Sequence, residues 1–304
     1  MRILPNQRIL SALRCPICQS RIELSEENAQ GGRSLFCGGQ RRHCFDISAS
    51  GYVNFMAPGR TAGGDSKQAV RARTDFLNLE LYRPVADALC RTVRRYIPVE
   101  DAVAVDAGCG EGYYTSLLAQ SGFSCVGFDL SRFAVDAAAK RTGKAGVQVG
   151  FFGVSSVFEM PIKNDSAAAV VNVFAPCAEE EYCRVLMPGG ILAVAYAGPE
   201  HLMGLKRAVY SQTRENDGRA DLPKRMKCVE EVRVRFDIEV KGTENVMNLF
   251  AMTPYYWKTS VSDMEKLKSL ESLTTAVDVI LAIYQKEDTA ADGQKKEDDG
   301  CRSH

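Results

Sequence analysis

Short apolar runs alternate with amphipathic segments through the middle of the chain. Buried strands are predicted by the apolar runs at 102–107, 125–128, 147–151, 167–174 and 191–196. Helical patterns separate these runs at 113–121, 132–141 and 179–186. Alternating strands and helices are typical of a parallel sheet that carries helices on both faces. The pattern therefore predicts an α/β fold.

The segments that flank this block predict the edges of the same domain. Two helices precede it, one at 67–79 with Ser66 as its N-cap and one at 84–96 that ends before Pro98. Strand-like alternation at 232–240 and an apolar run at 277–284 flank a helical stretch at 244–252. We expect the two late strands to form a hairpin-like pair at one edge of the sheet.

The first 58 residues differ from the rest, because Cys-Pro and Cys-Gly turns replace long helical patterns. We expect a small module at 1–58, a flexible linker or loop at 59–74 and the large domain at 75–285. The tail at 286–304 is charged and nearly free of apolar residues, so we expect it to be disordered. A chain of 304 residues is long enough for two domains.

Composition adds information about partners and location. The 38 Lys and Arg balance the 38 Asp and Glu, so the total charge gives no attraction to nucleic acid. Residues 1–75 alone hold 11 Lys and Arg against 6 Asp and Glu, which makes this part basic. The sequence has neither a run of about 18 apolar residues nor a signal-peptide core, so we expect a cytoplasmic protein.

A glycine-rich loop follows the first strand of the large domain and opens a helix. It runs Asp106-Ala107-Gly108-Cys109-Gly110-Glu111-Gly112. Glycines let the backbone approach a ligand closely, and the start of the helix offers unpaired N–H groups. A dinucleotide fingerprint would read G-x-G-x-x-G and serve a pyrophosphate, which an acid two positions earlier would repel. Asp106 and the strand-end acid Asp129 instead suit the ammonium group and the ribose hydroxyls of S-adenosylmethionine.

Four residues in the N-terminal module have a spacing that fits a structural zinc site. Cys15 and Cys18 form a C-x-x-C knuckle, and Cys37 and His43 follow it. Thiolate and imidazole ligands favour Zn²⁺, and four of them leave no open position for catalysis. Five residues separate Cys37 from His43, which is more than usual, so Cys44 stays an alternative fourth ligand.

The glycine loop, the strand-end acid Asp129 and the turn LMPGG at 186–190 resemble those of class I S-adenosylmethionine-dependent methyltransferases. This resemblance covers about residues 75–285. It implies a Rossmann-like, mostly parallel sheet of seven strands, preceded here by a small zinc-ribbon-like domain. It also implies that the last strand of the sheet runs antiparallel, which agrees with the pair expected at the edge.

The order of motifs along nearly the whole chain is similar to that of the bacterial large-subunit ribosomal RNA guanine-N1 methyltransferases of the RlmA type. These motifs are CPIC at 15–18, Cys37 with His43, FDI at 45–47, GYVN at 51–54, GDS at 64–66, DAGCGEGYYT at 106–115, FAPC at 174–177, GPEHLMGLK at 198–206 and MTPYYW at 252–257. The resemblance implies methyl transfer from S-adenosylmethionine to N1 of a guanine in a hairpin of 23S ribosomal RNA.

Matched residue by residue, the resemblance also implies site residues. It places the zinc ligands at Cys15, Cys18, Cys37 and His43. It places contacts with S-adenosylmethionine at Tyr82, Gly110, Glu111 and His201, in addition to Asp106, Gly108 and Asp129 from the loop pattern.

The sequence does not identify the group that accepts the guanine N1 proton, although Asp65 is one candidate, and Asn172 and the backbone beside it could hold the base edge. For RNA binding, we expect phosphate contacts and stacking platforms in the basic N-terminal part. The residues concerned are Arg41, Arg42, Arg60, Arg71, Arg73, Tyr52 and Phe55. Tyr255, Tyr256 and Trp257 either line a base pocket or cap the core.

Two rival functions stay open at this stage. The same core would support a methyltransferase of a small molecule, but the basic zinc module would then have no role. A zinc-organised RNA-binding protein with an idle cofactor site is the second rival. A homodimer also stays open.

Overall fold

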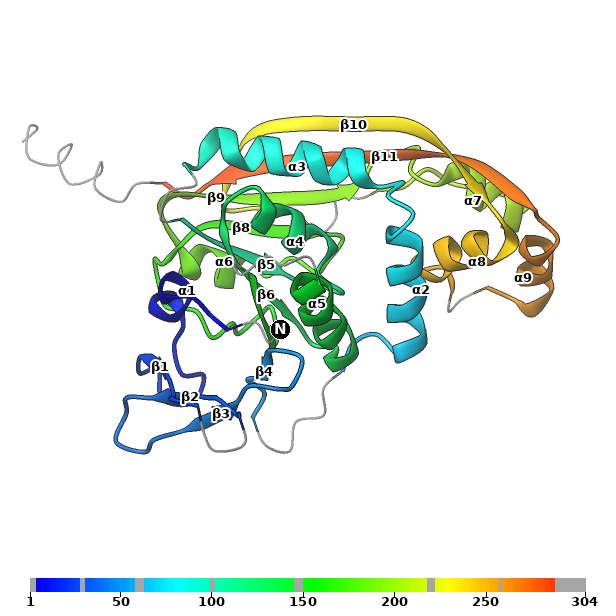
Figure 1. Cartoon of the computed structure of the whole chain (residues 1–304). Coiled ribbons are helices and arrows are strands. Elements are labelled where there is room, and N and C mark those ends of the chain that lie inside the picture. The colour runs from blue at the N-terminus through cyan, green and yellow to red at the C-terminus, as the bar shows by residue number, and fades with distance from the viewer. Residues whose placement is uncertain are drawn as a thin grey trace, which may run out of the picture.

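The computed structural model describes residues 4–27, 31–57, 63–98, 102–144, 150–217, 222–256 and 259–287. In these residues the chain forms one sheet of three strands and one of eight, with helices packed around the larger sheet (Figure 1). Arg60, Trp257 and most of the tail that we expected to be disordered lie outside the described residues.

The N-terminal part contains α1 (Gln7–Ala12), β1 (Ile22–Leu24), β2 (Ser34–Cys37), β3 (Cys44–Asp46) and β4 (Tyr52–Asn54). The first half of the large domain contains α2 (Lys67–Leu77), α3 (Arg83–Tyr96), β5 (Val103–Ala107), α4 (Tyr113–Gln120), β6 (Ser124–Asp129), α5 (Arg132–Lys144) and β7 (Gly150–Val154). The second half contains β8 (Ala167–Val173), α6 (Glu179–Val185), β9 (Leu186–Ala197), α7 (Met203–Val209), β10 (Lys227–Lys241), α8 (Thr243–Ala251), α9 (Val261–Lys268) and β11 (Ser272–Gln285). The α/β fold predicted from the apolar pattern is confirmed.

The large sheet has the strand order β10-β11-β9-β8-β5-β6-β7-β4. Its strands from β9 to β4 pair in parallel, whereas β11 runs antiparallel to both of its neighbours. The hairpin-like pair at one edge is therefore confirmed, with Lys227 opposite Gln285 at one end and Lys241 opposite Ser272 at the other. Both strands are longer than predicted, and they extend beyond the core to carry α7, α8 and α9 (Figure 1).

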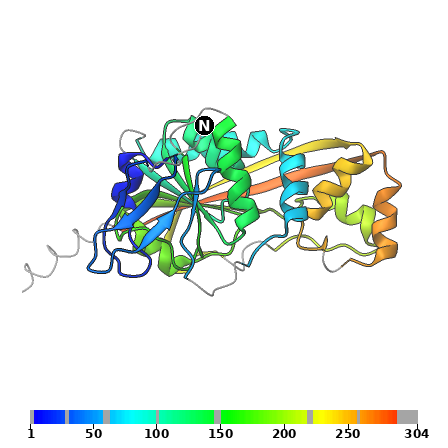
Figure 2. The same cartoon turned by 60° about the horizontal axis from the view of Figure 1, so that its bottom comes forward.

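The expectation of seven strands is wrong, because β4 from the N-terminal part adds an eighth. β4 pairs in parallel with β7, so that Tyr52 lies opposite Phe152 and Asn54 opposite Val154. An edge strand presents unpaired N–H and C=O groups, and β4 satisfies those of β7. The N-terminal part thus joins the core sheet at the end away from α8 and α9 (Figure 2).

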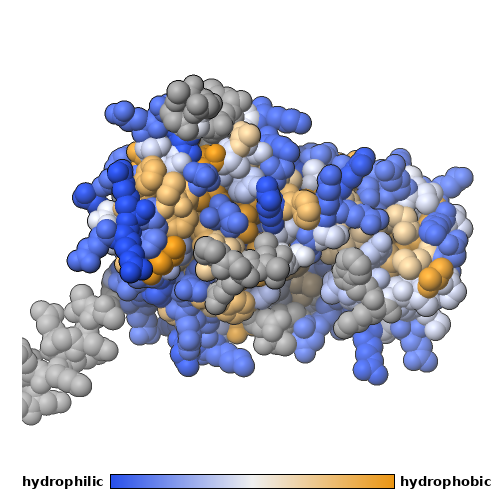
Figure 3. Space-filling view, turned by 90° about the horizontal axis from the view of Figure 1, so that it is seen from below, coloured by the Kyte–Doolittle hydropathy of each residue, from blue (hydrophilic) through white to orange (hydrophobic). Residues whose placement is uncertain are grey.

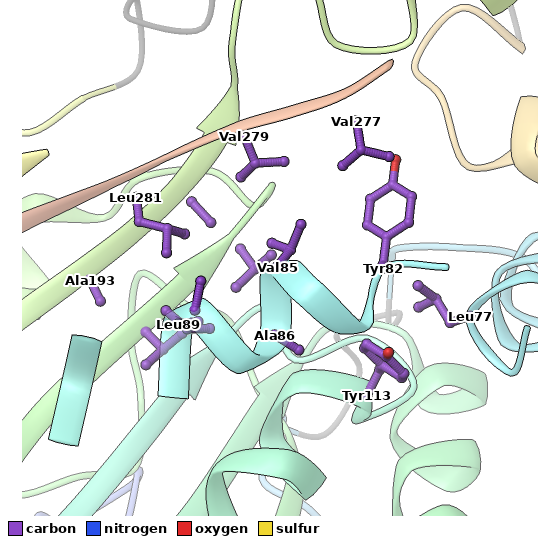
Figure 4. Packing of buried hydrophobic residues seen from close by; sticks show 14 of the residues in the cluster. Leu77, Tyr82, Val85, Ala86, Leu89, Tyr113, Ala193, Val277, Val279 and Leu281 are labelled. Carbon is purple, nitrogen blue, oxygen red and sulfur yellow. The ribbon is translucent and has the colours of Figure 1, made fainter. Parts of the chain in front are cut away.

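Helix α3 shows how the pattern of apolar residues positions one face of the core. Val85, Leu89 and Val93 recur every four residues and are buried, whereas the four arginines of the helix are exposed. Tyr82 and Val85 point toward Val277 and Val279 of β11 (Figure 4).

The opposite face of the sheet is covered by α1, α6 and the N-terminal strands. Ile9 and Leu13 of this part are fully buried in the same cluster as Val105 of β5. Asn6 caps α1 and donates a hydrogen bond from Nδ2 to Ser124 Oγ of β6 at 3.1 Å. The N-terminal part therefore shares a hydrophobic core with the large domain.

The surface seen from below is mostly polar, with small apolar patches between the charged side chains (Figure 3). None of the helices in the described residues combines the length and the apolar composition needed to cross a membrane.

Candidate functional site

The glycine loop lies where β5 and β6 end side by side. Ala107 of β5 pairs with Phe128 of β6, so the segments that follow them leave the same edge of the sheet. The backbone N–H of Gly110 donates to Oδ2 of Asp129 at 3.1 Å, and Ser131 N–H donates to Oδ1 at 2.7 Å. Burial raises the pKa of Asp129. The carboxylate thus ties the glycine loop to the end of β6, as expected for ligand sites in open α/β sheets.

Two glycines in the loop have no room for a side chain. Gly108 has a φ of +84°, and a Cβ there would lie 2.5 Å from Cβ of Ala175 in the loop after β8. Gly112, with a φ of +74°, precedes α4 and would place a Cβ 2.8 Å from Cβ of Ala138. The loop therefore packs closely against two other segments, and its path depends on glycine.

Asp106 lies within β5, buried beneath the loop. Thr115 of α4 donates its hydroxyl to Asp106 Oδ2 at 2.5 Å. Burial raises the pKa of Asp106 to about 7, and the carboxylates of Asp129 and Glu111 act in the same direction. A buried carboxyl group with such a pKa is poised to ionise when a cation binds beside it.

Helix α2 covers the glycine loop with an arginine. Arg73 Nε donates to Oε2 of the buried Glu111 at 2.5 Å, and its Nη1 pairs with Asp65. Burial disfavours the charged guanidinium, but the two carboxylates outweigh this effect and raise the pKa of Arg73. The position of α2 agrees with the predicted helix start, because Ser66 accepts a hydrogen bond from Ala69 N as its N-cap. This helix occupies part of the segment that we assigned to the linker.

Tyr82 and His201 are 119 residues apart in sequence, but they lie in contact. His201 Nδ1 accepts a hydrogen bond from the backbone N–H of Asp278 at 3.2 Å, so the imidazole proton is on Nε2. Nε2 in turn donates to the Tyr82 hydroxyl at 3.3 Å. Burial lowers the pKa of His201 to about 4, so the imidazole is neutral at pH 7. This pair is well formed, and each partner fixes the orientation of the other.

The structure brings the four expected zinc ligands together. The ligand atoms of Cys15, Cys18, Cys37 and His43 all lie within 4.8 Å of one another. His43 Nδ1 is 3.5 Å from Sγ of Cys15 and 3.4 Å from Sγ of Cys37, and the sulfurs of Cys18 and Cys37 are 3.6 Å apart. Tetrahedral zinc with bonds of about 2.0–2.3 Å needs ligand separations of about 3.5–3.8 Å.

The alternative ligand Cys44 points elsewhere, because its Sγ lies 3.7 Å from a carboxylate oxygen of Asp46. The residues therefore fit a structural zinc ion, held by Cys15, Cys18, Cys37 and His43. The long spacing between Cys37 and His43 is accommodated by a turn at 38–42, in which Cys37 N–H donates to the His43 carbonyl oxygen.

Three other expectations from the sequence are wrong. Tyr52 and Phe55 are buried, since β4 is part of the sheet, and they cannot stack on bases. Tyr52 instead accepts a hydrogen bond from Arg132, and Phe55 packs between other aromatic rings. Asn172 is also buried, and its amide binds Ala175 N–H and the Pro176 carbonyl oxygen, so it shapes its own loop rather than holding a base.

Two features of the candidate site were missed from the sequence. Phe174 is exposed at the carboxyl end of β8 and stacks on His201, with ring centroids 5.5 Å apart. The sequence offered one signal for Phe174: it directly follows an apolar strand, and the carboxyl ends of the parallel strands meet at the edge of the sheet that carries the glycine loop. The bridge from Arg73 to Glu111 had no signal in the sequence, because it depends on how α2 packs.

Comparisons with known proteins agree with this geometry. A family model described as a methyltransferase domain matches residues 99–253, about half of the chain. Together with the glycine loop and its two acids, this match defines a class I S-adenosylmethionine-dependent methyltransferase.

Three curated relatives specify the family further. A 23S rRNA (guanine(748)-N(1))-methyltransferase of Streptomyces fradiae is 31% identical over 208 residues, which is 67% of this chain and 69% of the relative. A protein of Micromonospora griseorubida, provisionally named 23S rRNA (guanine-N1)-methyltransferase, is 33% identical over 65% of this chain and 69% of its own length. YxjB of Bacillus subtilis, provisionally given the same name, is 26% identical over 91% of this chain and 98% of its own length. The chain belongs to the family of 23S rRNA (guanine-N1)-methyltransferases.

Proposed function

We propose that this enzyme transfers a methyl group from S-adenosylmethionine to N1 of a guanine in a hairpin of 23S ribosomal RNA. The observation that carries the proposal is the contact between Asp129 and the glycine loop, beside the buried Asp106. It supports a site for a ligand with both ribose hydroxyls and an ammonium group. The names of the three relatives support the RNA substrate.

The proposed cofactor site divides between two sets of residues. Asp129 has two carboxylate oxygens, each with one amide donor, so each keeps capacity to accept from a ribose hydroxyl. Gly108 and Gly110 let the backbone approach the ligand, and Asp106 faces its ammonium group. Because the Glu111 side chain binds Arg73, a contact of Glu111 with the ligand uses its main chain or displaces the arginine.

Tyr82 and His201 complete the site at its other end. The Tyr82 oxygen accepts from His201 Nε2, so the tyrosine proton is left to donate. We assign this proton to a carboxylate oxygen of the methionine part of the cofactor. The neutral imidazole supports this arrangement without adding a positive charge.

S-adenosylmethionine supplies an electrophilic methyl group on sulfur when it is bound. The residues of this chain contribute mainly by position, since a near-attack arrangement of two reactants lowers a barrier by roughly 7–11 kcal/mol. Guanine N1 carries a proton and is engaged in pairing, so the base has to leave its helix before it reacts. Asp65 stays a candidate acceptor for that proton, although its carboxylate pairs with Arg73.

The zinc cluster serves RNA binding in this proposal. A zinc ion held by the cluster would fix the turn that carries Arg41 and Arg42, and Arg42 lies over the ring of Phe36 at 4.6 Å. Arginines held in this way are suited to contact phosphates. From the proposed RNA substrate we infer a cytoplasmic location. The homodimer stays a prediction.

Primer extension tests the proposal directly. Ribosomal RNA from a strain that lacks the gene should allow full extension, and RNA from the complemented strain should stop one residue before a single guanine in 23S RNA. The methyl on N1 blocks base pairing and so causes the stop. Purified enzyme should transfer labelled methyl to the unmodified RNA but not to small quinone or phenol acceptors. Identical extension patterns would exclude the proposal, and transfer only to small acceptors would favour the first rival.

Calorimetry addresses the second rival, the RNA-binding protein with an idle cofactor site. We expect the purified chain to bind S-adenosylmethionine, and binding to weaken when Asp129 is changed to alanine. A chain that binds the RNA hairpin but shows no heat with S-adenosylmethionine would support the rival.

A further inference from the structure

The loop after β8 presents an aromatic ring to solvent at the edge of the sheet that holds the glycine loop. Phe174 is 47% exposed, although phenylalanine is usually buried. Its φ of +53° lies in the left-handed region, which is costly for a residue with a large side chain. Strained backbone that is kept in place by its surroundings often marks a functional position.

The surroundings hold the Phe174 ring from one side. The ring stacks on His201 at 5.5 Å between centroids, with 26° between the planes. His201 is itself fixed by the Asp278 N–H and the Tyr82 hydroxyl. Asp278 is buried and forms two hydrogen bonds with Arg233, at 2.7 and 2.9 Å. One face of the phenylalanine ring therefore rests on a rigid support, and its exposure leaves the other face open.

The same loop is in contact with the cofactor loop. A Cβ at Gly108 would lie 2.5 Å from Cβ of Ala175, the residue after Phe174. Asn172 holds the loop in shape by binding Ala175 N–H and the Pro176 carbonyl oxygen. Phe174 N–H donates to the Ala195 carbonyl oxygen of β9 at 3.0 Å. These bonds keep the exposed ring beside the segment that the cofactor approaches.

We propose that Phe174 is the platform on which the unpaired target guanine stacks while its N1 faces the methyl donor. This inference rests on the proposed function and adds to it a residue that positions the target base. A base that leaves its helix loses stacking energy, and an aromatic face in the protein returns part of it. A flat, neutral, apolar ring suits the face of a nucleobase better than it suits a phosphate or a charged ligand. Stacking tolerates any base, so selection of guanine rests on other groups.

The test uses three variants of the full chain and a hairpin transcript of the modified region. Phe174→Asn removes the ring with a residue that tolerates the left-handed backbone, and Phe174→Tyr retains a ring. Phe158→Leu is the matched control, because Phe158 is also an exposed phenylalanine, in the loop after β7, and is 61% exposed. Single-turnover methyl transfer, calorimetry with S-adenosylmethionine and the fluorescence of 2-aminopurine at the target position are measured for each variant.

We expect Phe174→Asn to slow single-turnover methyl transfer by about 5- to 150-fold, the range for loss of one base–aromatic stack. Affinity for S-adenosylmethionine should change by less than about threefold, and Phe174→Tyr should restore most of the rate. The 2-aminopurine probe, quenched by stacking in the wild-type complex, should become brighter with Phe174→Asn. Phe158→Leu should leave rate and fluorescence near those of the wild type.

The proposal is overturned if Phe174→Asn transfers methyl at the wild-type rate, or if its fluorescence matches that of the wild-type complex. It is also overturned if Phe158→Leu is impaired as much as Phe174→Asn. If the wild-type enzyme itself does not methylate the transcript, the proposed function fails instead, so the two failures are distinguishable.

Discussion

The zinc cluster and the proposed cofactor site are built in different ways. The zinc ligands lie within 29 residues of one another, from Cys15 to His43, on short strands and turns. The residues of the proposed cofactor site extend from Tyr82 to His201, and the order of strands in the sheet brings them together. One site depends on local turns that a metal closes, and the other depends on the packing of the whole domain.

The two sites also differ in how much stabilising free energy depends on any one residue. A bound structural zinc contributes through a few strong bonds, so the loss of a single ligand removes most of its effect. In the proposed cofactor site no single group ties the residues together, so we expect each substitution to remove one contact and to leave the fold in place. We therefore expect large, all-or-none effects in the first site and smaller, graded effects in the second.

The largest effect is expected for Cys37→Ser. Zinc contributes roughly 10–16 kcal/mol to the folding of small modules, and serine is a poor ligand. The variant should lose its zinc, measured with a colorimetric chelator after gel filtration. Because β4 connects this part to the core sheet, the loss of zinc should lower the thermal midpoint of the whole chain by about 10 °C or more.

The control for Cys37→Ser is Cys44→Ser, because Cys44 points to Asp46 and not to the cluster. It should retain one zinc per chain and the wild-type midpoint. Retention of zinc in Cys37→Ser, or its loss in Cys44→Ser, would mean that a different set of residues holds the metal.

The second effect concerns the packing of the glycine loop. Gly108→Ala forces a Cβ to within 2.5 Å of Ala175 at a φ of +84°, which should lower the free energy of unfolding by about 2–4 kcal/mol. Gly63→Ala is the matched control, since a Cβ there meets nothing within 4 Å, and it should change stability by less than about 0.5 kcal/mol. Chemical denaturation compares the two, and equal values would show that the loop relaxes without cost.

The third effect is mainly on ligand affinity. Asp129→Asn removes the charge that is proposed to accept from the ribose hydroxyls, so affinity for S-adenosylmethionine should fall by about 10- to 100-fold. Asp136→Asn, on the following helix, changes a carboxylate that binds Ser50 and Lys140, and it should leave affinity unchanged. Isothermal calorimetry measures both. An unchanged affinity in Asp129→Asn would remove the main support for the cofactor site.

Those parts of the molecule that depend on local pattern were predictable from the sequence. The apolar spacing of α3, the glycine loop after β5 and the C-x-x-C knuckle each follow from neighbouring residues. The eighth strand was not predictable, because β4 has only three residues and no alternation that distinguishes it from a turn. The burial of Tyr52 and Phe55 follows from that pairing, so it could not be seen either.

The proposed cofactor site was predictable only in part for the same physical reason. Asp106 and Asp129 could be expected to lie close together, since parallel strands end at the same edge. The contacts of Arg73 with Glu111 and of Phe174 with His201 depend on tertiary packing and on a backbone angle at one residue. No pattern of residue types along the chain encodes these.

The smallest effect concerns Asp106, whose burial affects stability and whose charge is proposed to affect cofactor binding. Its pKa is raised from 3.8 to about 7 by burial, so between these values the folded protein holds a proton that the unfolded chain has lost. The free energy of unfolding of the ligand-free protein therefore falls as the pH rises through this window. Asp106→Asn has no such proton, so its stability relative to that of the wild type should rise from pH 5 to pH 8, by an amount on the order of 1–3 kcal/mol.

Asp106→Asn should also bind S-adenosylmethionine less tightly, because the cofactor's ammonium group loses its partner. Denaturation at the two pH values with and without the cofactor measures both effects. A pH dependence of stability that is the same in both proteins would mean that Asp106 is ionised throughout.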